Sequence, residues 1–101
     1  MDWYYPILVG VLRGRAAEAR LAAKWDTFVA PGRGVRCVSD QPWVTAAETC
    51  EAVMAMHLCG LEADAADLFD SVQYLRADDG SYWTGHNYVE GEHYPENERT
   101  T

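Results

Sequence analysis

The stretch DDGSYWTG, residues 78–85, decides how we expect the chain to fold. Its aspartates and glycines favour a tight turn, because both residue types readily adopt turn conformations. Tyr82 and Trp83 do not suit a turn at the surface, since such a turn has no use for so much apolar area.

Four other segments carry apolar residues at helical spacing. They cover residues 6–14, 15–29, 43–59 and 62–76. The third segment is apolar on nearly all sides, which predicts a buried helix, whereas the fourth has one apolar and one acidic face. The sequence therefore predicts an all-α fold of two antiparallel helical hairpins in one domain, residues 1–101, with residues 77–101 mostly in loops.

Composition and charge narrow the classes of partner. The chain has 101 residues and a net charge of −8, and residues 62–101 carry ten acids against Arg76 and Arg99. Such an acidic segment repels nucleic acid and anionic lipid. There is no apolar run long enough to span a membrane and no signal-peptide pattern. The three cysteines have no CxxC spacing and indicate buried thiols in a reducing compartment. We therefore expect a cytoplasmic protein without a cofactor.

Two longer stretches resemble a known superfamily. SVQYLRADDGSYWTG, residues 71–85, is similar to repeats of the prenyltransferase and squalene/hopene cyclase superfamily. In those repeats a glutamine late in one helix precedes a D-G-S-x-W-type loop, a pattern that this chain matches with Gln73, Asp79, Gly80, Ser81 and Trp83. WVTAAETCEAVMAMHLCGL, residues 43–61, looks like the inner helix of such a repeat. SDQPWVTAAETC and the closing ENERTT resemble lead-ins to inner helices in small bacterial members.

The resemblance implies a fold and a function. The fold would be an (α/α)6 barrel, a toroid of helical hairpins around an apolar cavity for isoprenoid chains, and this chain would form only part of it. In such a fold Tyr82 and Trp83 would turn inward and brace neighbouring hairpins, where each ring would bury about 150–250 Å². Stacking of a ligand on the rings is the alternative. We therefore expect a fragment of a prenyltransferase-like or terpene-cyclase-like protein that joins the remainder of its parent chain or associates with itself. Alone it would be inactive, because a partial ring encloses no water-free cavity. The alternative is a non-catalytic α-solenoid module that docks onto a protein partner.

Glu48 and Glu51 are the candidate catalytic residues. The superfamily's D-x-D-D and D-D-x-x-D motifs are both absent, and Glu48 stands where a zinc-binding histidine of protein prenyltransferases would be. Thr45 and Glu48 also have the spacing of a capping box, which explains the acid structurally. Two carboxylates three residues apart could share a proton in acid chemistry on a cation-forming substrate. The alternative is that both acids stabilise the positive end of the helix dipole. We expect no metal.

Trp43, Tyr82, Trp83 and His57 are the candidate substrate-binding residues. The three aromatic residues would shape or brace the apolar cavity. His57 lies among methionines and leucines late in the third helical segment, where a core histidine is the alternative to a ligand contact. Residues 85–96 contain two histidines and several acids that could gather a divalent metal, but their spacing matches no known scheme of zinc ligands.

Overall fold

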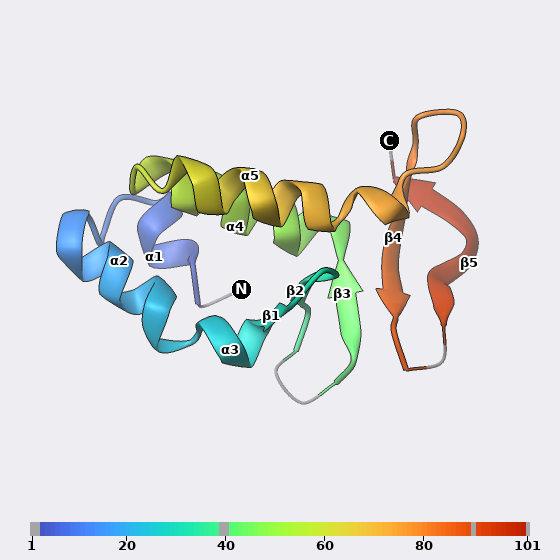
Figure 1. Cartoon of the computed structure of the whole chain (residues 1–101), viewed down its shortest axis with the longest axis horizontal. Coiled ribbons are helices and arrows are strands. Elements are labelled where there is room, and N and C mark those ends of the chain that lie inside the picture. Colours follow the sequence, from blue (N-terminus) through green and yellow to red (C-terminus); the bar gives the residue numbers. More distant parts are fainter. Residues whose placement is uncertain (1–2, 39–40, 90, 101) are drawn as a thin grey trace.

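The computed structural model describes residues 3–38, 41–89 and 91–100, and for residues 92–100 only the backbone is described. Helices fill one end of the molecule and an antiparallel sheet forms the other (Figure 1). The prediction of an all-α fold is therefore wrong, and so is the prediction of a toroid built only from helical hairpins. The chain has a mixed α/β fold.

The helices follow the predicted segments in part. They are α1 (Tyr5–Leu8), α2 (Gly14–Ala23), α3 (Trp25–Phe28), α4 (Ala46–Leu58), α5 (Glu62–Ser71) and the 3-10 turn η1 (Gln73–Leu75). Pro6 begins the first helix, as its fixed φ favours. Gly60, with a φ of +76°, lies in the turn that separates α4 from α5. The segment predicted as one helix over residues 15–29 is divided at Lys24.

Within the described residues, five strands form the sheet. They are β1 (Val29–Ala30), β2 (Gly34–Arg36), β3 (Trp43–Thr45), β4 (Tyr82–Asn87) and β5 (Glu92–Thr100), paired in sequence order and antiparallel throughout. Strands β1 to β3 lie in segments that we read as helix ends or loops. Strands of two or three residues are too short to show the alternation on which a sequence prediction depends. Helices α4 and α5 connect β3 to β4 (Figure 1).

The register of β3 and β4 divides their side chains between two faces. Trp43 pairs with Asn87, Val44 with His86 and Thr45 with Gly85. Because residues directly opposite one another share a face, Trp43 and Asn87 lie on one face, and Val44 and His86 on the other. A Cβ added at Gly85 would lie 2.5 Å from the carbonyl oxygen of Val44. Glycine therefore permits the close approach of the two strands.

The aromatic pair of the opening stretch begins strand β4. Tyr82 and Trp83 are half-buried and pack against a cluster of buried residues between the sheet and the end of α5. The cluster comprises Ala30, Val44, Ala46, Val72 and Leu75. The two rings thus brace a strand against helices, and not one helical hairpin against another.

A second and larger core lies among the helices. Its buried residues come from the N-terminal segment, α1, α2, α4, α5 and the first two strands, and include Tyr4, Leu21, Val35 and Met56. Among the described residues, no helix is both long and apolar enough to cross a membrane.

Candidate acid site at the start of helix α4

Glu48 is held at the first turn of α4 by Thr45. The backbone N–H of Glu48 donates to the Thr45 hydroxyl oxygen at 3.2 Å, and that hydroxyl donates to the Glu48 carboxylate at 2.6 Å. Thr45 is therefore the N-cap of α4, as the capping-box spacing predicted. The Glu48 side chain remains half-buried and is not enclosed in the core.

Cys37 directly follows strand β2, and its thiol lies beside the Glu48 carboxylate. The backbone N–H of Cys37 donates to the carbonyl oxygen of Trp43 at 2.8 Å, so the two residues face each other across neighbouring strands. Burial, and then a hydrogen bond to Glu48, raise the pKa of the Cys37 thiol. The thiol therefore stays neutral beside the Glu48 carboxylate.

Glu51 is held by a residue far away in the sequence. The hydroxyl of Tyr4 donates to the Glu51 carboxylate at 2.6 Å. Tyr4 is fully buried, and burial, followed by the hydrogen bond to Glu51, raises its pKa well above the ordinary value of a phenol. Tyr4 therefore remains a neutral donor. No local pattern connects residues 47 positions apart, so the sequence did not predict this contact.

Thr49 fixes α4 to the sheet between these two acids. Its side chain is fully buried, and its hydroxyl oxygen accepts from the backbone N–H of Val35 at 2.9 Å. The same hydroxyl donates to the carbonyl oxygen of Thr45 at 2.7 Å. The start of α4, which carries both acids, is thus tied to strand β2.

A recess of about 140 Å³ opens beside Trp43 on the sheet. We call it the Trp43 recess, and its lining residues are Cys37, Trp43, Val44, Thr45, His86 and Asn87. Its surface is mostly carbon, and the Trp43 side chain is 45% exposed at its edge. Cys37 and Thr45 line the recess and also contact Glu48. The arrangement brings a flat aromatic side chain, a small apolar hollow and a carboxylate together.

The other predicted substrate-binding residues lie apart from this site. Tyr82 donates its hydroxyl to the side-chain oxygen of Gln73 at 2.6 Å, on the part of β4 that packs against η1. His57 is exposed near the far end of α4, and its Nδ1 lies 2.9 Å from a carboxylate oxygen of Glu62. Nine residues of helix separate His57 from Glu48, a rise of about 14 Å. The structure therefore does not bring His57 together with the acids.

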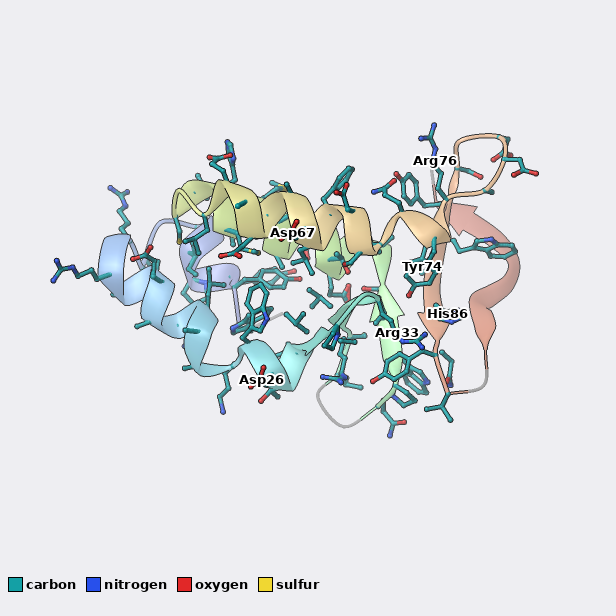
Figure 2. All side chains as sticks on the ribbon, viewed as in Figure 1. Asp26, Arg33, Asp67, Tyr74, Arg76 and His86 are labelled. Carbon is teal, nitrogen blue, oxygen red and sulfur yellow. The ribbon has the colours of Figure 1, made fainter. Side chains whose placement is uncertain are left out.

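Arg33, Tyr74 and His86, the last of which also lines the Trp43 recess, gather at the junction of the sheet and η1 (Figure 2). The rings of Tyr74 and His86 meet edge to face with centroids 5.3 Å apart, and the Arg33 guanidinium lies 4.9 Å from the centroid of the Tyr88 ring. Burial raises the pKa of Tyr74 to about 12, although the charge of Arg33 acts in the opposite direction. The group packs aromatic and cationic side chains where the sheet meets the helices.

A third region pairs acids with a tryptophan. Asp64 and Asp67 lie on α5 and line a groove of about 230 Å³ that also contains Trp25. Figure 2 shows Asp67 on this helix. Sequence reasoning placed both acids on an outer helix face. It did not associate them with Trp25, which lies about 40 residues earlier in the sequence.

The described part of the chain contains no group of three or more histidine, cysteine or acidic side chains that could hold a metal ion. The metal hypothesis for residues 85–96 depends on Glu90 and on side chains from residue 92 onward, which lie outside the described residues.

The chain is similar in sequence to a glycoside-cleaving enzyme. The chain is 54% identical, over all of its 101 residues, to the MMP endo-(1,4)-3-O-methyl-alpha-D-mannosidase of Mycolicibacterium hassiacum. It spans about 28% of the length of that protein. No model of a known protein family matches the chain.

This relative corrects the functional expectations. A chain 54% identical to a mannosidase along its whole length gives no support to membership of the prenyltransferase and cyclase superfamily, so that interpretation is wrong. The expectation of an isoprenoid-binding transferase or cyclase is wrong for the same reason, and the scaffolding alternative is not favoured because the relative is an enzyme. The D-G-S-x-W-like stretch is not specific to that superfamily, because an aspartate–glycine turn followed by aromatic residues also suits the start of a strand, here β4.

Proposed function

We propose that the protein carrying this sequence is a glycoside hydrolase that cleaves internal α-1,4 bonds between 3-O-methylmannose units. The observation that carries the proposal is the 54% identity along all 101 residues to a protein named for this activity. Because the chain corresponds to only 28% of that protein, the residues described here would supply part of the substrate-binding region and part of the chemistry.

Glycoside hydrolysis commonly needs two carboxyl groups. One gives its proton to the bridging oxygen as the bond to the anomeric carbon breaks, and the other stabilises or attacks that carbon or activates the water that replaces the leaving sugar. Glu48 and Glu51 are our candidates for such acids. They lie three residues apart on one helix, where Cβ atoms are about 5–6 Å apart. The transition state is a cation on the sugar, which nearby carboxylates stabilise.

The surroundings of the two acids support this assignment. Both side chains are half-buried, and each is oriented by a hydroxyl donor 2.6 Å away, from Thr45 for Glu48 and from Tyr4 for Glu51. The exposed indole of Trp43 supplies a flat apolar surface near Glu48 on which a sugar ring can pack. An acid pair beside an aromatic side chain suits a saccharide better than an isoprenoid.

The test is hydrolysis of α-1,4-linked 3-O-methylmannose oligosaccharides by the complete gene product, with products identified by mass spectrometry. Glu48→Gln and Glu51→Gln are the informative variants, because glutamine keeps an oxygen that accepts the Thr45 or Tyr4 hydroxyl but cannot serve as an acid or an anion. Asp64→Asn and Asp67→Asn are matched controls, since these acids lie on the neighbouring helix and line a different groove.

We expect the wild-type protein to release shorter methylmannose oligosaccharides and the two glutamine variants to lose about 100-fold or more of kcat, as is typical when an acid–base group is removed. The asparagine controls should retain activity. A wild-type protein that leaves the oligosaccharide intact would refute the proposed reaction. Normal rates in both glutamine variants, with loss in the controls, would move the acids to the groove beside Trp25.

A further inference from the structure

The Trp43 recess has a shape and a chemistry that the hydrolytic step does not use. Its lining residues lie on β3 and β4, except for Cys37, which follows β2. The hydrogen bond from Cys37 to Trp43 and the pairing of Trp43 with Asn87 set these segments side by side. His86, on β4, is labelled in Figure 2. The recess is therefore built mainly by the sheet.

The recess is small and mostly apolar. Its volume is about 140 Å³, close to the engineered cavity of about 150 Å³ that holds a benzene molecule. A whole sugar ring with its hydroxyl groups is too polar for such a lining, because each hydroxyl placed there would need a hydrogen-bond partner. A methyl ether and the adjoining carbon atoms of a sugar ring fit both the size and the polarity.

The position of the recess fits the proposed substrate. Cys37 and Thr45 belong to its lining and also contact the Glu48 carboxylate. A sugar packed on the exposed indole of Trp43 could thus place one edge in the recess while another edge faces the acid. What distinguishes this substrate from ordinary mannose is one added methyl group at each 3-position.

We propose that the Trp43 recess binds the 3-O-methyl group of a methylmannose unit and selects methylated over unmethylated chains. The inference rests on the proposed function and adds to it the part of the protein that reads the methyl group. An apolar pocket discriminates one added methyl or methylene group by about 10-fold to 200-fold. Most of the preference for the methylated substrate should therefore come from this recess.

The experiment compares kcat/KM for two oligosaccharides of equal length and α-1,4 linkage, one of 3-O-methylmannose and one of unmethylated mannose, on the complete gene product. Cys37→Leu places a larger apolar side chain in the lining of the recess, and Trp43→Ala removes an exposed part of that lining. Val38→Leu is the matched control, because Val38 directly follows Cys37 in the chain, is 40% exposed and does not line the recess. Circular dichroism checks that each variant is folded.

We expect the wild-type protein and Val38→Leu to prefer the methylated chain by about 10-fold or more, and both recess variants to lose most of that preference. Since Trp43 is exposed, Trp43→Ala keeps the test decisive if Cys37→Leu does not fold. A wild-type protein that cleaves both chains equally would overturn the recess assignment and leave the proposed reaction standing. A preference that survives in a folded recess variant would overturn it too. Cleavage of neither chain would refute the proposed function and this inference with it.

Discussion

Replacing Thr49 by valine tests the link between the acid-bearing helix and the sheet. Valine has nearly the shape of threonine but lacks the hydroxyl group that accepts from Val35 and donates to Thr45. Thr49 has no exposed surface, so water cannot replace the lost partner. The backbone N–H of Val35 would remain buried without an acceptor.

The magnitude follows from what each partner loses. The carbonyl oxygen of Thr45 keeps its place at the start of the helix, so its loss is small. The N–H of Val35 loses its acceptor, which costs about 1–3 kcal/mol for a buried donor. We therefore expect Thr49→Val to lower the free energy of unfolding by about 2 kcal/mol. Thr49→Ser keeps the hydroxyl and removes one buried methyl group, a loss of about 1 kcal/mol.

The assay is equilibrium urea denaturation followed by far-ultraviolet circular dichroism, with the slope of the transition compared among wild type, Thr49→Val and Thr49→Ser. A change in midpoint at constant slope reports stability alone. Valine should therefore be the more damaging of the two substitutions. If Thr49→Val is as stable as wild type, or if Thr49→Ser is the less stable variant, then the hydroxyl group does not hold α4 to β2.

Two other predictions concern a glycine in strand β2 and a tyrosine of η1 that packs against the sheet. Gly34→Ala should lower the free energy of unfolding by about 2–5 kcal/mol in the same assay, because the residue has a φ of +129° and the new Cβ would lie 2.7 Å from Val44 Cγ1. Gly32→Ala is the control, since nothing lies within 4 Å of its new Cβ, and it should lower this free energy less. Equal losses in the two variants would refute the packing argument. The pKa of Tyr74 is about 12 in the folded state and near 10 in the unfolded state. The contribution of Tyr74 to the free energy of unfolding is therefore complete below pH 10 and is lost as the pH rises toward 12. Urea midpoints measured across that range should therefore fall more steeply for wild type than for Tyr74→Phe, and parallel curves would contradict this assignment.

The candidate site was accessible to sequence reasoning only where its contacts are local. The cap formed by Thr45 and Glu48 was predicted because its two residues lie three apart and recur at helix starts. Glu51 was selected as an acid, but its partner Tyr4 was not, because their contact exists only after the N-terminal segment packs on α4. Trp43 was selected as an aromatic residue, and the recess beside it was not foreseen, since its lining comes from β3, β4 and the residue after β2.

The sequence by itself determined the helices α4 and α5, the cap between β3 and α4 and the glycine turn after Cys59, because each depends on residues close together in the sequence. It also determined the acidic character of the chain, which follows from composition alone. Only the tertiary structure decided the sheet. Strands β1 to β3 have two or three residues each, and β4 pairs with β3 after an intervening stretch of two helices. Such pairing is set by the packing of distant segments, and it places Asn87 of β4 beside Trp43 of β3 in the lining of the Trp43 recess.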